Sequence, residues 1–137
     1  MSDLNQDLER IVRQFAADSG TIHLLEADGV LHLKAATANI PPFVLDKVKL
    51  VPVGKGMAGL AVERNTPVNT CNIQTDTTGD VRSGAKATGL EGAIVVPIQR
   101  DGAAIGALGI ANRSERTFTD AEIADLLREG QAIGAAN

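Results

Sequence analysis

Two Asp-Gly pairs, Asp28-Gly29 and Asp101-Gly102, constrain the fold of this chain most strongly, because each lies between two apolar, strand-like runs. Asp-Gly in this setting is a strong short-range signal for a β-hairpin. The sequence therefore predicts hairpins over residues 21–38 and 93–112. Hairpins require antiparallel pairing, so the chain is expected to build an antiparallel sheet.

The register of each hairpin follows if each Asp-Gly pair is taken as a two-residue loop. The expected cross-strand partners are then Leu25 with His32, Leu24 with Leu33, Ile98 with Ile105, and Val96 with Ala107.

Helical periodicity and turn residues divide the rest of the chain. An amphipathic helix is expected from Ser2, its predicted cap, and a last helix with a capping box formed by Thr119 and Glu122. The remaining expected elements are short helices from Pro42 and over 56–65, and strands over 49–53 and 66–73. Helices at both ends suit one face of the sheet, which predicts an α+β domain.

Composition limits the classes of function. The chain has 137 residues and 44% apolar residues, which fits one folded domain over 1–137. Its net charge of −4 and lack of a basic stripe argue against nucleic acid as a partner. No apolar run reaches the roughly 18 residues of a membrane span, and the acidic N-terminus does not resemble a secretory signal. A cytoplasmic location without membrane contact is the expectation.

The spelling G-x-G-x-x-G at Gly54, Gly56 and Gly59 is that of a dinucleotide-binding loop. Such a loop belongs to a parallel β-α-β unit, whereas this one lies between predicted hairpins. We therefore interpret the first two glycines as a tight turn with positive φ, and Gly59 as a point of close helix packing. Binding of an anion by amides at the helix start stays open.

Three segments together resemble the GAF domain family: "VPVGKGMAGLAVERNTPVN", "GAIVVPIQRDGAAIGALGIAN" and "RTFTDAEIADLLREGQAIG". They are similar to its glycine turn and helix, its second hairpin and its closing helix. The resemblance covers essentially the whole chain. It implies a central antiparallel sheet of about five or six strands, with terminal helices on one face. On the other face, loops and short helices would enclose a small-molecule pocket.

The resemblance also implies a sensory module, often a homodimer through its terminal helices, that acts on a signalling effector. Whether the chain is a fragment of a larger sensor or a separate receptor stays open. The expected function is binding of a small molecule, with anions as one candidate class, between the sheet and residues 72–91. The alternative is a ligand-free dimerisation or interaction module with a filled pocket. We expect no cofactor and no metal.

The long polar loop and the last strand supply the candidate ligand-binding residues. Small residues on one face of that strand either leave space for a ligand or let a helix approach. The sequence pairs Ile105, Ala107, Gly109 and Ala111 with Ile98, Val96, Ile94 and Gly92 and predicts an apolar pocket floor. Specificity would then come from the loop residues Asp76, Asp80, Arg82, Ser83, Lys86, Thr88 and Glu91.

Within that loop, Arg82 and Lys86 could clamp an anion such as nitrate or a carboxylate. Ordinary solvation of a charged loop is the competing interpretation.

Cys71 is the only cysteine, so the chain cannot form an internal disulfide. It is a candidate pocket residue, but the favoured interpretation is a small buried apolar side chain. The GAF branch that reduces free methionine-(R)-sulfoxide carries several cysteines and aspartates that this chain lacks. A dithiol relay needs at least two thiols, so thiol catalysis is not expected.

Other ligand classes receive little support. His23, His32 and Lys34 are expected on one face of the first hairpin, and a solvated strand face is favoured over a metal pair. The absence of Tyr, Trp and a His beside Cys71 disfavours a bilin. Arg113 is expected to tie the last strand to Glu122 or Asp120 of the closing helix, which adds little support for cyclic nucleotides.

Overall fold

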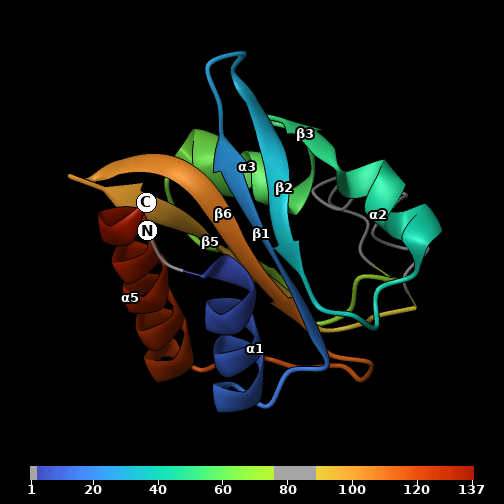
Figure 1. The fold of residues 1–137 in the computed structure, drawn as a ribbon. Helices are drawn as coiled ribbons and strands as arrows, with labels where there is room; N and C mark the ends of the chain where they lie inside the picture. The colour runs from blue at the N-terminus through green and yellow to red at the C-terminus, as the bar shows by residue number, and fades with distance from the viewer. Residues whose placement is uncertain (1–2, 76–88) are drawn as a thin grey trace.

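A six-stranded sheet forms the centre of the molecule in the computed structural model (Figure 1), which describes residues 3–75 and 89–137. In chain order the elements are α1 (Leu4–Gln14), β1 (Ser19–Leu25), β2 (Val30–Ala36), α2 (Pro42–Val48), β3 (Leu50–Pro52), α3 (Gly56–Arg64), β4 (Val68–Thr70), β5 (Ala93–Arg100), β6 (Ala103–Ala111) and α5 (Asp120–Ala136).

The strands lie in the order β3-β2-β1-β6-β5-β4, and every described pair is antiparallel. The predicted α+β class with an antiparallel sheet is therefore confirmed. Because the described strands contain no parallel pair, the G-x-G-x-x-G segment does not belong to a β-α-β unit. The two central strands, β1 and β6, pair with each other, although about 80 residues of sequence separate them.

The predicted register of the first hairpin is wrong by one residue. Leu24 pairs with His32 and Leu25 with Leu31. The chain uses a three-residue loop, in which Gly29 has a φ of +77°. A glycine with positive φ at the end of such a loop is a common alternative to the two-residue turn.

The second hairpin turns at Asp101-Gly102 as predicted, with φ values of +53° and +81°. These positive values are those of the turn that matches the twist of the strands. The register nevertheless shifts directly after Ile98, which pairs with Gly106 rather than Ile105. One extra residue in one strand is a β-bulge, and it changes the pairing of everything beyond it. Val96 consequently pairs with Leu108, and Ala107, Gly109 and Ala111 pair with Pro97, Val95 and Ala93.

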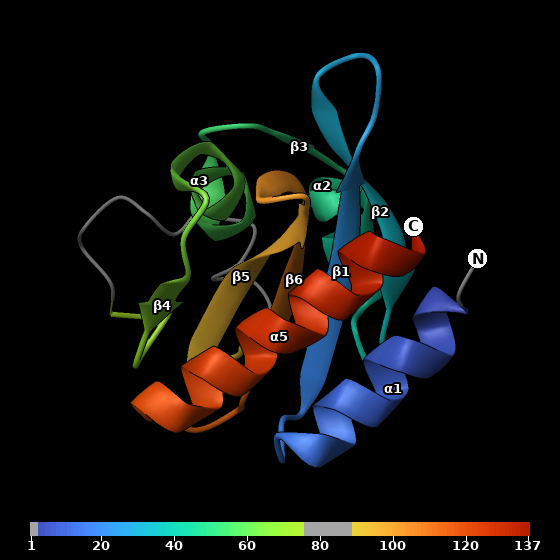
Figure 2. The same cartoon turned by 90° about the vertical axis from the view of Figure 1, so that its left-hand side faces the viewer.

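Helices α1 and α5 lie side by side on one face of the sheet (Figure 2), which confirms the predicted position of the terminal helices. Arg10 of α1 forms an ion pair with Glu129 of α5 at 3.0 Å. The core beneath them is a single apolar cluster whose buried members are Leu8, Ile11, Val12, Phe15, Ile22, Ala35, Ile94, Val96, Ile98, Leu108, Ile110, Phe118, Leu126 and Ile133.

Glycines bring α5 unusually close to β5. A Cβ atom at Gly130 would lie 2.7 Å from the carbonyl oxygen of Pro97, and one at Gly134 would overlap that of Gln99. Only glycine permits this approach, because any side chain would push the helix off the strand. The close helix packing on this face thus comes from glycines of the helix, not from the small residues of β6.

Side-chain caps fix the starts of both terminal helices. The predicted capping box is confirmed: Thr119 accepts a hydrogen bond from the Glu122 amide, and Glu122 accepts one from the Thr119 amide. The first helix is capped by Asp3, which accepts from the amides of Asn5 and Gln6; the predicted cap, Ser2, lies outside the described residues. Aspartate and serine are comparable N-caps, so sequence alone could not choose between adjacent candidates.

The predicted tie between the last strand and the closing helix exists, but Arg116 makes it instead of Arg113. The Arg116 guanidinium lies 2.6 Å from Glu122 and donates to the buried Asn112 side chain. It also stacks over Phe118, 4.4 Å from the ring centroid. The Thr119 amide and Arg116 together lower the pKa of the Glu122 carboxyl. The backbone amide of Arg113 donates to Asp18 instead.

None of the helices in the described part of the chain has the length and hydropathy of a membrane span.

Candidate functional site

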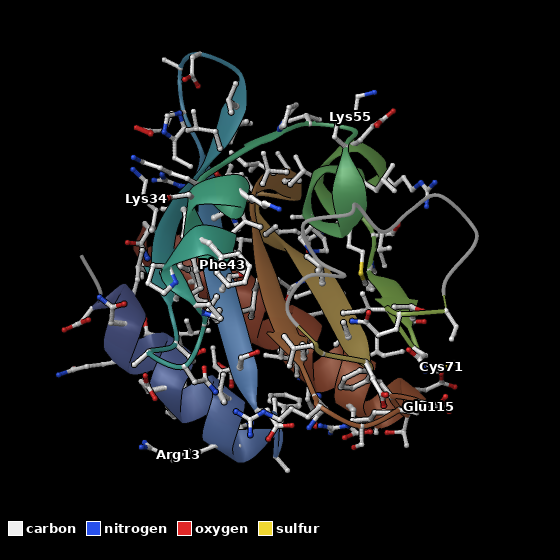
Figure 3. The ribbon with its side chains drawn as sticks, turned by 90° about the vertical axis from the view of Figure 1, so that its right-hand side faces the viewer. Arg13, Lys34, Phe43, Lys55, Cys71 and Glu115 are labelled. Carbon is white, nitrogen blue, oxygen red and sulfur yellow. The ribbon has the colours of Figure 1, made fainter. Side chains whose placement is uncertain are left out.

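A cavity of about 360 Å³ lies on the sheet face opposite α1 and α5. Its walls are the faces of β1, β5 and β6, helix α2 and the first turn of α3, on the side that Figure 3 shows. The lining residues are Ser19, Gly20, Thr21, His23, Ile40, Val44, Lys47, Val48, Val51, Lys55, Gly56, Met57, Ala58, Ile73, Leu90, Ala93, Val95, Gly109, Ile110 and Ala111. A volume of this size is in the usual range for small-molecule sites.

The cavity floor is not purely apolar, which corrects the sequence-based expectation. Alternate residues of β1 share one face of the sheet. This face presents Ser19, Thr21 and His23 to the cavity, and Ser19 and His23 are buried. Strand β1 therefore contributes two hydroxyls and one imidazole to a lining that is otherwise mostly apolar.

His23 joins the sheet to helix α2. Its Nε2 atom lies 2.8 Å from the carbonyl oxygen of Val48, the last residue of α2. The last carbonyls of a helix have no intrahelical partner, so the imidazole satisfies one of them. Burial lowers the pKa of His23, and the hydrogen bond to Val48 only partly opposes this effect. The ring is therefore expected to be neutral near pH 7.

The two histidines of the first hairpin do not form a pair. The observed register places His23 opposite Leu33, on the cavity face, whereas His32 lies opposite Leu24. His32 instead contacts Glu26 and Asp28 at 2.9 and 2.8 Å. Within residues 3–75 and 89–137, no group of three His, Cys, Asp or Glu side chains is arranged to hold a metal ion.

Two lysines line the cavity, Lys47 of α2 and Lys55 at the start of α3. Neither belongs to an ion pair with another described residue. The described lining includes no aspartate or glutamate. Both lysines are exposed, so the described lining carries positive charge on its solvent-facing side chains, without a compensating carboxylate.

The glycine turn shapes the cavity wall at the start of α3. Gly54 and Gly56 have φ values of +88° and +66°, which confirms the predicted left-handed turn. A Cβ atom at Gly59 would overlap the carbonyl oxygen of Pro52, so this glycine holds α3 against β3. Lys55 occupies the N-cap position without a side-chain cap. The first amides of α3 consequently lack intrahelical acceptors beside the cavity.

The small residues of β6 serve both purposes that the sequence left open. Gly109 and Ala111 line the cavity and leave space there. Ala107 is buried in a cluster with Val62 of α3, where a small side chain lets the helix approach. The observed pairing with Pro97, Val95 and Ala93 places all three on the cavity side of the sheet.

Most of the predicted loop candidates, namely Asp76, Asp80, Arg82, Ser83, Lys86 and Thr88, lie outside the described residues. Glu91 is described and half-buried, and its backbone amide donates to the carbonyl of Asn112. Glu91 is not among the lining residues, whereas Ile73 and Leu90, near the two ends of the loop, are. Helix α2 contributes Val44, Lys47 and Val48 to the lining, which fits the expectation that short helices enclose the pocket.

Cys71 follows β4 and is exposed, so the favoured interpretation as a buried apolar residue is wrong. It is labelled at the end of β4 in Figure 3 and does not line the cavity. Its carbonyl accepts a hydrogen bond from the Arg116 amide, and the neighbouring Asn72 and Ile73 are the buried residues of this segment.

The solvated face favoured for His23 is wrong, because this residue is buried, and sequence reasoning did not consider Lys47 or the hydroxyls of β1. One signal was available for His23, because it lies within "TIHLL", an almost continuous apolar run. Such runs are typical of strands that are covered on both faces, where alternation no longer separates inside from outside. A histidine within such a run is expected to be buried.

Comparison with known proteins gives a consistent family assignment. The family model for the GAF domain matches residues 3–135. Among curated proteins, none matches the sequence of this chain.

Solved structures are similar in fold at low sequence identity. The type II free methionine-R-sulfoxide reductase from Thermoplasma acidophilum has a TM-score of 0.79 and 20% identity, over 96% of this chain and 86% of the reductase chain. The GAF domain of a phosphoenolpyruvate-protein phosphotransferase from Coxiella burnetii gives 0.79 and 21%, over 96% and 78%. A domain described as part of a two-component sensor histidine kinase from Sinorhizobium meliloti gives 0.78 and 16%, over 97% and 87%.

These similarities extend along nearly the whole chain, and the sheet order and the helices on its two faces agree with them. With the match of the family model over residues 3–135, they show that this chain belongs to the GAF domain family.

Proposed function

We propose that this GAF domain is a sensory module that binds a small anionic molecule in the cavity between the sheet and α2. The observation that supports this proposal most directly is that Lys47 and Lys55, two exposed lysines on an otherwise largely apolar lining, form no ion pair with a described residue. An anion held beside two cations gains charge-assisted hydrogen bonds, which are stronger than neutral ones. The free amides at the start of α3 add a second favourable site for negative charge.

Two observations favour a binding role over the alternatives, which are a module with a filled pocket and a thiol enzyme. A module with a filled pocket would leave no space beneath α2, whereas the cavity has a volume of about 360 Å³. A thiol enzyme of the dithiol type needs two cysteines, and this chain has one, which is exposed and outside the cavity lining. Homodimerisation through the terminal helices and action on an effector protein remain part of the proposal.

Thermal-shift measurements against nitrate, short carboxylates, 2-oxoacids, amino acids and nucleotides test this function. At 100-fold excess over its Kd, a ligand stabilises the folded state by about 2.7 kcal/mol. We expect at least one anion to raise the melting temperature by several degrees, and the double substitution Lys47→Gln and Lys55→Gln to remove most of that shift.

The matched control is Lys49→Gln, which removes the same charge two residues from Lys47 but outside the cavity lining. Its effect on anion binding should be small, because exposed charges outside the site act only weakly through solvent. Equal loss in Lys49→Gln, or stabilisation by no anion of the panel, would contradict the proposed function.

A further inference from the structure

The imidazole of His23 carries a hydrogen-bond acceptor that the protein does not use. Nε2 lies 2.8 Å from the Val48 carbonyl, which can only accept, so Nε2 must carry the proton. In the neutral ring, Nδ1 is then a bare acceptor. Nδ1 is buried and has no hydrogen-bond partner among the described residues.

This acceptor belongs to a ring that lines the cavity. His23 is 3% exposed and lines the cavity between helix α2 and strand β1. A buried polar atom left without a partner typically costs about 1–3 kcal/mol. The connection to α2 needs only Nε2, so it leaves the second ring nitrogen of this lining residue without a partner. A ligand that donates to Nδ1 would remove the cost.

The charged form of the ring would change this chemistry, because both nitrogens would then donate. Two features of the cavity disfavour that form. Burial lowers the pKa of His23. The other charged groups on the described lining, Lys47 from α2 and Lys55 from α3, are both cations. The acceptor is therefore present at neutral pH.

We propose that His23 determines the specificity of the cavity, because its Nδ1 atom accepts a hydrogen bond from an uncharged N–H or O–H group of the ligand. This inference rests on the proposed function for the anionic part of the ligand. The combined class is a compact anion with a neutral donor, such as a hydroxy acid or an N–H heterocycle with an acidic group. An ammonium donor does not fit, because no carboxylate is found on the described lining.

The neighbouring hydroxyls of Ser19 and Thr21 do not provide the same selection. Each can donate or accept, so each tolerates either kind of ligand group. Nδ1 can only accept. A site built around such a group discriminates strongly against an analogue that lacks the matching donor, because the buried acceptor is then left unpaired.

Phenol and toluene test the inference with uncharged probes of nearly equal size, of which only phenol donates. In the untagged protein labelled with ¹⁵N-histidine, we expect phenol to shift the His23 Nδ1 resonance and toluene to leave it unchanged. Since the chain has two histidines, His32→Gln assigns the spectrum and serves as the control variant. The free protein should show Nε2 protonated and Nδ1 unprotonated at pH 7.

The same pair of probes gives a binding test. The preference for phenol over toluene should fall about tenfold or more in His23→Leu and remain in His32→Gln. An Nδ1 that is protonated in the free protein, an Nδ1 resonance that phenol does not move up to its solubility limit, or a phenol preference that survives in His23→Leu would each overturn the inference. The spectra of the unsubstituted protein decide the matter if His23→Leu does not fold.

These outcomes separate the inference from the proposed function. If phenol moves Nδ1 and no anion binds, the role of His23 stands and the anionic ligand is wrong. If an anion binds through Lys47 and Lys55 but phenol leaves Nδ1 unchanged, the proposed function stands and the inference is overturned.

Discussion

Helices cover both faces of the central sheet, but they do so in different ways. On one face, Gly130 and Gly134 bring α5 down to the backbone of β5, and the space between is filled by apolar side chains. On the other face, α2 meets the central strands through the hydrogen bond of His23 to Val48 and leaves a cavity of about 360 Å³. The first arrangement maximises dispersion contacts, and the second preserves space and exposes polar groups to it. The packed core and the proposed binding site thus lie on opposite sides of the same strands.

The closest helix contact provides the most severe test of this comparison. In Gly134→Ala, the new methyl group overlaps the Gln99 carbonyl, so α5 must move away from β5. We expect a loss of about 2–3 kcal/mol in the free energy of unfolding, measured by urea denaturation. Gly130→Ala should cost less, because its Cβ would lie 2.7 Å from the Pro97 carbonyl. In an unconstrained helix, the same change stabilises by about 1 kcal/mol. If Gly134→Ala were instead more stable than the unsubstituted protein, α5 would not pack closely on β5.

Two adjacent valines of β5 compare the faces directly, because Val96 belongs to the filled core and Val95 lines the cavity. We expect Val96→Ala to cost about 2 kcal/mol and Val95→Ala less than about 1 kcal/mol. Truncation opens a new void at Val96 but only widens an existing one at Val95. Both substitutions lose the same β-strand propensity, so propensity does not contribute to the difference between them. Equal losses in denaturation experiments would mean that the two faces are packed alike.

The pH dependence of stability tests the buried imidazole and is expected to be the smallest effect. The pKa of His23 is lowered in the folded protein, so the unfolded chain binds this proton more readily. The stability linked to His23 is complete above about pH 6.5 and is lost as the pH falls through the folded-state value.

Melting temperatures between pH 7.5 and 5.5 provide the measurement. The decrease on acidification should be smaller in His23→Leu than in the unsubstituted protein, whereas His32→Gln should retain a decrease that depends on His23. Identical pH profiles for His23→Leu and the unsubstituted protein would mean that the imidazole is exposed to solvent. They would contradict the description of the cavity face as one that buries a polar side chain.

Local chemistry made much of the fold predictable. Asp101-Gly102 specified a turn with positive φ at both positions, and Thr119 with Glu122 specified a helix start. The glycines of the turn before α3 were interpreted correctly for the same reason, since positive φ leaves few other residue types. Signals of this kind act over four or five residues, so they are present in the sequence itself.

Registers and burial were less predictable because they depend on distant partners. The bulge after Ile98 shifts the pairing of β5 with β6, and no residue type in that segment demands it. The burial of His23 depends on β1 pairing with both β2 and β6, which places it in the middle of the sheet. The resemblance implied that short helices enclose the pocket, but nothing in "PFVLDKV" indicates which strand α2 crosses.

The two nitrogens of the His23 ring are electronically connected, and this gives the hydrogen bond to Val48 a further meaning. When Nδ1 accepts a hydrogen bond, the ring becomes a better donor at Nε2, because neighbouring hydrogen bonds polarise one another. A ligand that reaches Nδ1 would therefore tighten the hold of the sheet on α2. Because such coupling is reciprocal, an interaction that moves α2 away from β1 would weaken ligand binding by the same free energy. The His23 side chain would thus couple ligand binding in the cavity to the position of α2.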